Sequence, residues 1–485
     1  MTLKDLQPQA IWKNFELLNA VPRPSKKEER VIQFMIDFGK NLGFETERDL
    51  IGNVLIKKPA TAGMENRQTV VLQSHLDMVH QKNNDTDFDF DTQGIQMYVD
   101  GDWVRAKGTT LGADNGLGVA TIMAVLESTN MPHPAIEALF TIDEETGMTG
   151  ALKLKRNWLK GTILLNLDTE DDDEIGIGCA GGIDISATRN YPMIPVPQGY
   201  SGLQILIKGL NGGHSGVDIH LGLGNANKIL ARLLQDVASK VPFGLVSIDG
   251  GSLRNAIPRE AKAEVVCKVE DVDKLQQEVQ ILGDLIKLDY KTIDPGLVIS
   301  TTVFAAPERM LTSEDQSTLL TALRVAQNGV YRMSPDIEGL VETSNNLARV
   351  LLFEGKLMVH CLTRSSVESS RDDLANVLRA AFEIADCDVV FSGGYPGWKP
   401  NTNSDILRVL VQLYKRLNNG EEAKVAAIHA GLECGILGER NPGMDMVSFG
   451  PTIKGAHSPD ERASISSVQK YWTFFKEVLS NIPSK

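Results

Sequence analysis

The stretch TVVLQSHLD, residues 69–77, indicates the fold class of this 485-residue chain. It opens with apolar residues typical of a buried strand and ends in the polar pair His75 and Asp77. On a strand, residues i and i+2 point to the same face, so we expect Asp77 to reach the imidazole of His75. A buried strand that ends in such residues is typical of a site at the carboxyl edge of a parallel sheet.

Two further apolar runs have the same form. Residues 136–145 and 162–168 are predicted as strands, and both end in carboxylates. Between the strands, residues 115–128 carry apolar side chains at helical spacing, and Asp114 stands just before them in an N-cap-like position. Strands that alternate with helices predict an α/β domain with a mainly parallel central sheet flanked by helices.

The middle of the chain changes character. Residues 186–395 contain paired strand patterns interrupted by helical ones, which predicts an inserted α+β domain built from β-α-β-β-type units. We therefore expect a discontinuous first domain formed by residues 1–185 and 396–485. On this reading His457 returns to the first domain after a long insertion, which is a common way to extend a finished sheet.

The residue types at the strand ends indicate a metal site. Zinc favours histidine nitrogen and carboxylate oxygen, and catalytic zinc sites leave a position open for water. Two histidines and three carboxylates suffice for two divalent ions if one carboxylate bridges, and Asp114 is the natural bridge. Zn²⁺ is the expected metal, although such ligands also suit Co²⁺ and Mn²⁺. The predicted ligands are His75, Asp114, Glu145, Asp168 and His457.

Two carboxylates beside these ligands have other predicted roles. Asp77 would orient the imidazole of His75 and raise its basicity. Because adjacent residues at a strand end point apart, Glu145 can bind metal while Glu144 faces a bound water as general base. Each feature alone has an ordinary explanation as a cap, a solvated turn or a structural histidine. Their occurrence together and in order favours the two-metal hydrolase.

Composition narrows the function classes. The formal net charge of −14 argues against a nucleic-acid partner. No apolar run approaches the 18 residues of a membrane span, and the first residues lack the apolar core of a secretory signal. The five cysteines are widely spaced without a CxxC motif, which favours a reducing cytoplasm.

The chain resembles the co-catalytic zinc exopeptidases, and among them the bacterial aminoacyl-histidine dipeptidases. Supporting segments span residues 51–461, nearly the whole chain. The segments that carry the resemblance are VVLQSHLDMV, GTTLGADNGLG, FTIDEETGMTGA, LLNLDTE and GPTIKGAHSPDE.

The resemblance implies how the ligands divide. His75, Asp114 and Asp168 would hold one ion, and Asp114 would share the other with Glu145 and His457. Asp77 and Glu144 match the family's orienting residue and general base.

The resemblance also assigns the insertion. Residues 186–395 would form a lid domain through which two copies dimerise. His214 would polarise the scissile carbonyl, Asn255 and Arg364 would hold the substrate, and Gly431 would supply a backbone contact. An arginine fork suits a free carboxylate.

The implied reaction is metal-dependent hydrolysis of small peptides with C-terminal histidine, including β-Ala-His. Three alternatives stay open. The chain could be a related exopeptidase or deacylase acting on tripeptides or N-acyl amino acids. It could also be a non-catalytic metal or peptide binder, or a structural protein on an α/β scaffold.

Overall fold

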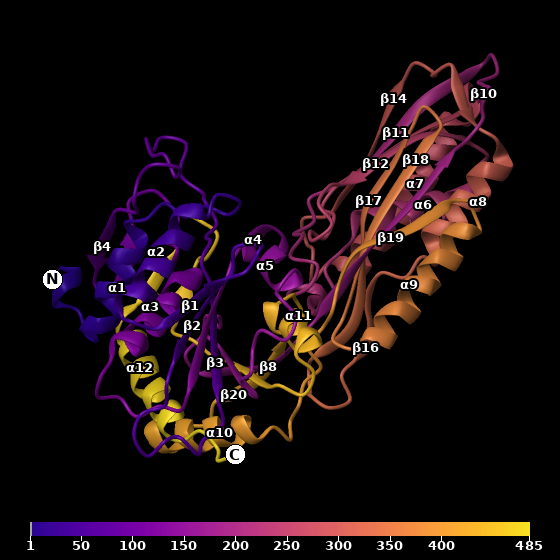
Figure 1. The fold of residues 1–485 in the computed structure, drawn as a ribbon. Helices are drawn as coiled ribbons and strands as arrows, with labels where there is room; N and C mark the ends of the chain where they lie inside the picture. Colours follow the sequence, from indigo (N-terminus) through magenta and orange to yellow (C-terminus); the bar gives the residue numbers. More distant parts are fainter. Residues whose placement is uncertain (1) are drawn as a thin grey trace. The chain divides into compact units, whose positions relative to one another are not determined.

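The computed structural model describes residues 2–485, which form two compact units (Figure 1). The first unit contains residues 2–178, 398–427 and 432–485. The second contains residues 179–397 and the short segment 428–431. The expected boundary at 186 falls inside a strand, Gly181–Asn190, which belongs wholly to the second unit.

The first unit is built on an eight-stranded sheet with the order β1-β2-β6-β3-β7-β21-β8-β20. Its four central strands, β6, β3, β7 and β21, run parallel, and antiparallel strands flank them. The strands are β1 (Glu45–Arg48), β2 (Val54–Lys58), β3 (Val70–His75), β6 (Ile136–Thr141), β7 (Ile163–Asn166), β8 (Glu174–Cys179), β20 (Lys424–Ile428) and β21 (Asp445–Ser448). The predicted mainly parallel sheet is confirmed.

Helices and a small second sheet complete this unit. Helix α3 packs against β3 and α1, while α10 packs against β21 and α12. The helices are α1 (Gln9–Asn19), α2 (Glu29–Asn41), α3 (Ala113–Glu127), α4 (Glu144–Gly147), α5 (Thr149–Leu152), α10 (Asp405–Leu417), α11 (Glu433–Arg440) and α12 (Ile465–Ser480). The small antiparallel sheet contains β22 (Ile453–Lys454), β23 (Arg462–Ser464), β5 (Trp103–Ala106) and β4 (Met97–Asp100).

The second unit is an antiparallel sheet covered by helices, which confirms the predicted α+β insertion. The sheet runs β14-β11-β13-β12-β17-β18-β9-β19, with β16 paired to β17. Its strands are β9 (Gly181–Asn190), β11 (Tyr200–Lys208), β12 (Gly244–Gly251), β13 (Ala261–Lys268), β14 (Val298–Phe304), β16 (Gly329–Met333), β17 (Val341–Phe353), β18 (Lys356–Ser365) and β19 (Asp388–Tyr395). The helices are α6 (Ala226–Ala238), α7 (Val272–Tyr290), α8 (Ser313–Val325) and α9 (Glu368–Glu383), and β10 (Met193–Pro195) pairs with β15 (Arg309–Leu311).

Local structure differs from expectation where the acidic residues lie. The strand predicted for 136–145 ends at Thr141, and Glu144 begins the short helix α4 instead of ending a strand. The chain turns because Asp143 adopts a left-handed conformation, with φ of 54°. Asp114 has extended rather than helical dihedral angles and lies two residues after Gly112, which has positive φ.

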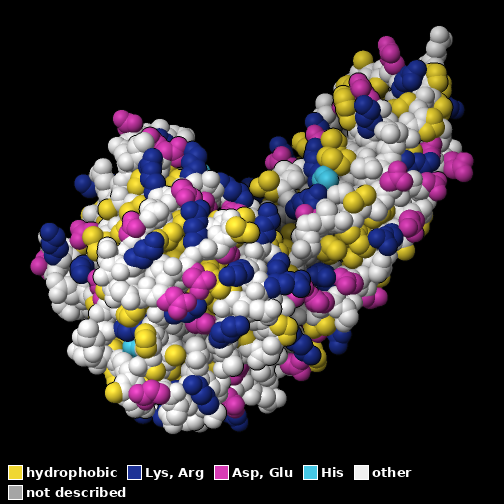
Figure 2. Space-filling model, viewed as in Figure 1, with side chains coloured by type: hydrophobic (Ala, Val, Ile, Leu, Met, Phe, Trp, Pro, Cys, Tyr) yellow, Lys and Arg dark blue, Asp and Glu magenta, His cyan; other side chains and the backbone are white. Residues whose placement is uncertain are grey.

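The surface carries charges of both signs. Figure 2 shows Lys and Arg side chains interspersed with Asp and Glu over the visible face. Among the described helices, none has the length and apolar character needed to cross a membrane.

Candidate metal centre

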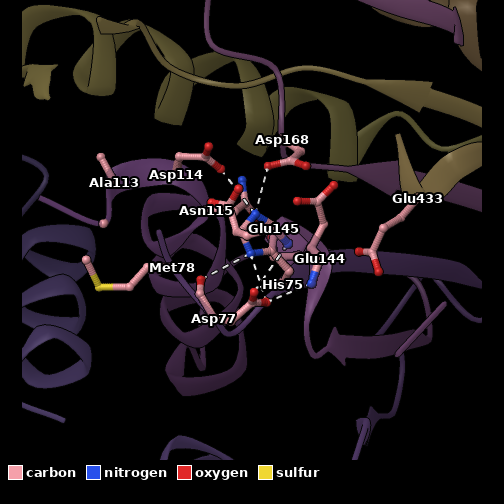
Figure 3. Close-up of polar contacts among 12 residues, drawn as sticks. His75, Asp77, Met78, Ala113, Asp114, Asn115, Glu144, Glu145, Asp168 and Glu433 are labelled. Carbon is pink, nitrogen blue, oxygen red and sulfur yellow. Dashed lines mark hydrogen bonds and ion pairs between the residues drawn. The ribbon is translucent and has the colours of Figure 1, made fainter. Parts of the chain in front are cut away.

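Four of the predicted ligands meet at the carboxyl end of the parallel strands in the first unit, namely His75, Asp114, Glu145 and Asp168 (Figure 3). His75 is the last residue of β3, and Asp168 follows β7 by two residues. Glu145 lies in the first turn of α4, and Asp114 lies at the start of α3. Because neighbouring parallel strands end at one edge, these side chains converge although they are far apart in the sequence.

Asp114 stands between the two histidines. Its Oδ1 lies 3.1 Å from His75 Nε2, and its Oδ2 lies 3.0 Å from His457 Nε2. His457 Nε2 is also 3.0 Å from Glu145 Oε2, and His75 Nε2 is 3.6 Å from Asp168 Oδ1. The donor atoms of these predicted ligands thus form two groups that share the Asp114 carboxylate, which is the arrangement expected of a bridging ligand.

The donor set fits divalent cations. Glu145 Oε1 and Asp168 Oδ1 are buried and have no hydrogen-bond partner among the described residues. Burial raises the pKa of Asp168 well above its ordinary value, and hydrogen bonds to Asp114 and Glu145 raise that of His457 to about 11. Such shifts mean that the crowded carboxylates need positive charge nearby. Imidazole and carboxylate ligands of this kind suit zinc, cobalt or manganese.

Asp77 is held by three donors. Its carboxylate accepts hydrogen bonds from Ser25 Oγ (2.7 Å) and from the backbone N–H groups of Glu144 (3.0 Å) and Glu145 (3.3 Å). Its Oδ1 lies 3.4 Å from His75 Nδ1, and its backbone oxygen lies closer, at 3.1 Å. Asp77 therefore contacts His75 as expected, but from a turn beyond the strand rather than from one strand face.

A second group of carboxylates lies next to Asp77 and has its own protein partners. Asp77, Asp143 and Glu28 are all buried and close together. Asp143 is paired with Lys26 Nζ, and Glu28 Oε1 accepts the backbone N–H of Lys26 at 2.8 Å.

A row of buried polar side chains crosses the sheet one step behind the ligands. Glu433 Oε2 accepts from Gln73 Nε2 and Thr141 Oγ1, both at 2.6 Å. Asn166 donates to Gln73 Oε1 (2.6 Å), and Ser448 donates to Asn166 (2.5 Å). Thr141, Gln73, Asn166 and Ser448 lie on the four adjacent strands β6, β3, β7 and β21, and Glu433 begins helix α11. The row therefore joins these strands at the edge that carries the site. Sequence reasoning missed it because isolated polar residues inside strands have no distinctive spacing.

The second unit contains the other predicted site residues. His214 Nδ1 accepts the N–H groups of Gly216 (3.2 Å) and Val217 (3.0 Å), so the neutral ring carries its proton on Nε2. Burial and the nearby Arg364 guanidinium lower the pKa of His214, which favours this neutral form. The exposed Asn255 accepts the N–H of Ser215 through its backbone oxygen at 2.8 Å, which joins the two loops.

Arg364 is a buried cation without a carboxylate partner in the described chain. Its side chain is 5% exposed, Nη1 donates to Tyr395 Oη at 2.9 Å, and Nε has no partner. His429 lies near it and bonds Ser344 Oγ through Nε2 at 2.7 Å. Gly431 belongs to the same short segment as His429.

Comparison with known proteins identifies the family. The model of peptidase family M20/M25/M40 matches residues 71–481. The chain belongs to this peptidase family. The cytosol non-specific dipeptidase of Escherichia coli K12 is 44% identical over 483 residues, covering 100% of this chain and 99% of that protein. The crystal structure of aminoacylhistidine dipeptidase from Vibrio alginolyticus is 46% identical, with a TM-score of 0.93 over 100% of this chain and 98% of that one.

More distant members share the architecture. An aminopeptidase from Bacillus cereus is 15% identical with a TM-score of 0.57, covering 98% of this chain and 99% of that one, which shows the fold alone. The resemblance inferred from the motifs is confirmed at the level of the M20 family and its fold.

Proposed function

We propose that this M20 family member is a metal-dependent dipeptidase that hydrolyses dipeptides with C-terminal histidine, including β-Ala-His. The observation that carries the proposal is the carboxylate of Asp114 set between His75 and His457 in a chain that matches two dipeptidases over its full length. One relative is named for aminoacyl-histidine substrates, and the other is called non-specific. Histidine is therefore a preferred residue within a wider range of dipeptides.

Two divalent ions, most simply Zn²⁺, fit the five ligands. His75, Asp114 and Asp168 would hold one ion, while Asp114, Glu145 and His457 would hold the other. When bound, such a pair supplies Lewis acidity and lowers the pKa of water.

Glu144 transfers the proton. No side-chain hydrogen bond joins its carboxylate to another described residue, which leaves it available to water and substrate. Glu144 accepts a proton from the attacking water and then donates it to the leaving amine. Asp77 holds the His75 ring in the orientation that directs Nε2 toward the site.

The second unit supplies the substrate contacts. His214 donates its Nε2 proton to the carbonyl oxygen as negative charge develops there. Arg364 binds the substrate carboxylate, which provides the counter-charge that a buried guanidinium needs. Asn255 and the backbone at Gly431 complete the contacts in this proposal.

We assign residues 186–395 as the core of a lid through which two copies associate. An exposed apolar stripe on α7 supports the assignment, because Ile281, Leu285 and Leu288 lie three to four residues apart and are 44%, 52% and 62% exposed. Strand β14 beside it is a sheet edge, with Val298 and Val303 also exposed. The name of the Escherichia coli relative supports a cytoplasmic location.

A substrate panel tests the proposal. Purified protein is stripped with a chelator, reloaded with Zn²⁺, Co²⁺ or Mn²⁺, and assayed on β-Ala-His, Gly-His, Gly-Leu, a tripeptide and an N-acetyl amino acid. We expect activity to disappear on chelation, to return with metal, and to be highest on the histidyl dipeptides. Preferred hydrolysis of the tripeptide or the acyl amino acid would assign the related exopeptidase or deacylase activity instead. No turnover of any member by the loaded protein would indicate a non-catalytic binder.

A further inference from the structure

The turn that carries Asp114 is held by one buried carboxylate. Glu461, 2% exposed, accepts four consecutive backbone N–H groups of residues 111–114. Its Oε2 accepts Leu111 N (2.7 Å) and Gly112 N (3.0 Å), and its Oε1 accepts Ala113 N (2.7 Å) and Asp114 N (3.2 Å). Hydrogen bonds to an ionised acceptor are roughly twice as strong as neutral ones.

The same turn is held on its carbonyl side by a buried guanidinium. Arg23, 1% exposed, donates from Nη2 to the Gly112 oxygen at 2.5 Å. Its Nη1 donates to the backbone oxygens of Leu76 and Asp77, both at 3.0 Å. Arg23 therefore ties the turn after His75 to the turn before Asp114.

Glycine makes this approach possible. A Cβ atom at Gly112 or at Gly116 would lie 2.6 Å from Arg23 Nη2, closer than real Cβ contacts. Gly112 also has φ of +69°, which other residues rarely adopt. The GADNG segment thus leaves room for the arginine as well as forming the turn.

The two charged groups join three ligand-bearing segments that are distant in the sequence. Glu461 lies four residues after His457 and binds the backbone of Asp114, so it connects two ligands proposed for one ion. Arg23 connects the same turn to the residues that follow His75. Within residues 2–485, neither side chain forms a hydrogen bond or ion pair with a side chain of the proposed ligands, so both act through the backbone.

We propose that Glu461 and Arg23 are positioning residues of the metal centre, which hold Asp114 at the distance from His457 and His75 that a bridging ligand needs. The inference rests on the ligand set of the proposed function. Partners that orient ligands typically contribute about 10- to 100-fold in metal affinity.

The test is Glu461→Gln, because a glutamine amide offers one acceptor oxygen and turns its NH₂ group toward two of the four N–H donors. The matched control is Glu137→Gln. Glu137 is another buried glutamate of the first unit that accepts two backbone N–H groups, from Lys160 (2.7 Å) and Gly161 (2.9 Å), but it lies near the start of β6, away from the ligands.

Metal content after gel filtration, Zn²⁺ affinity by chelator competition and the visible spectrum of the Co²⁺-loaded protein are compared. We expect Glu461→Gln to bind one of the two ions about 10- to 100-fold more weakly and to shift the Co²⁺ spectrum. Glu137→Gln should keep wild-type values in all three measurements, even if its unfolding midpoint falls.

The inference would be overturned if folded Glu461→Gln bound both Zn²⁺ ions with wild-type affinity and had an unaltered Co²⁺ spectrum. This result would leave the proposed function intact. Equal metal loss in Glu137→Gln would also overturn it, because the effect would then be general destabilisation. If Glu461→Gln does not fold, the variant Arg23→Lys provides the test. Lysine keeps the positive charge but lacks the planar guanidinium that donates to several backbone oxygens. Wild-type metal binding in Arg23→Lys would overturn the inference. A wild-type chain that binds no second ion would instead contradict the proposed function.

Discussion

Glu144→Gln separates proton transfer from metal binding in this site. The substitution keeps the shape of the side chain and removes its ability to take a proton. It also keeps the backbone N–H that donates to Asp77 Oδ1 at 3.0 Å, so Asp77 and the neighbouring Glu145 retain their places. The proposed metal ligands do not include Glu144, and its carboxylate holds no other described side chain.

The expected loss is therefore confined to the chemical step. General acid–base catalysis by one side chain contributes about 10²- to 10⁴-fold, which corresponds to about 3–5 kcal/mol of transition-state free energy. Because Arg364 and His214, the proposed substrate contacts, are unchanged, KM should stay within a few-fold of wild type. We expect kcat to fall by roughly a factor of 10³ with two ions still bound.

The assay combines steady-state hydrolysis of Gly-His with metal analysis of the same preparations. Glu145→Gln is the comparison variant, because it changes a proposed ligand and should lose metal and activity together. A Glu144→Gln enzyme that keeps more than about a tenth of wild-type kcat would refute the proton-transfer role, which requires at least 10². Loss of metal from Glu144→Gln equal to that from Glu145→Gln would show that the two residues had been assigned wrongly.

Three further substitutions test other parts of the site. Ser25→Ala removes the 2.7 Å hydrogen bond to Asp77 and should weaken Zn²⁺ binding roughly tenfold in chelator competition; unchanged affinity would show that Ser25 does not support the site. Tyr395→Phe removes the partner of Arg364 and should raise KM for Gly-His several-fold with little change in kcat, whereas a change confined to kcat would contradict a binding role. Burial and the Arg364 charge lower the pKa of His429 to about 3, so the unfolded chain binds the extra proton between pH 6.5 and 3, and stability is lost as pH falls below about 6.5. His429→Gln should remove on the order of 2 kcal/mol of that loss between pH 7 and 5 in urea unfolding, and an identical pH dependence in both proteins would exclude this origin.

Much of the candidate metal centre could be predicted from the sequence because strand ends and ligand chemistry are local properties. Apolar runs that end in His75 and Asp168 indicate where strands stop, and parallel strands place their ends along one edge. The position of Glu144 was predicted less well. The strand stops at Thr141, and the left-handed conformation of Asp143 turns the chain into a short helix. This helix is too short to produce a hydrophobic periodicity in the sequence.

The supporting residues could not be predicted, for a physical reason. Glu461 and Arg23 act on backbone N–H and C=O groups, which every residue except proline presents in full. A contact with backbone groups therefore does not require a particular residue type at the contacted position, and the sequence shows no pattern there. The buried row ending at Glu433 is similar, because its members meet only when four strands are laid side by side.

The sequence alone determined the mainly parallel α/β domain and the inserted α+β domain, which follow from hydrophobic periodicity. It also indicated the candidate metal ligands, from the chemistry of histidine and carboxylate. The tertiary structure decided which residues lie close together. It set the Asp114 carboxylate between His75 and His457, and it brought Glu461 to the turn before α3 across some 350 residues of chain. Distances between residues so far apart depend on the packing of the whole unit, and no local pattern encodes them.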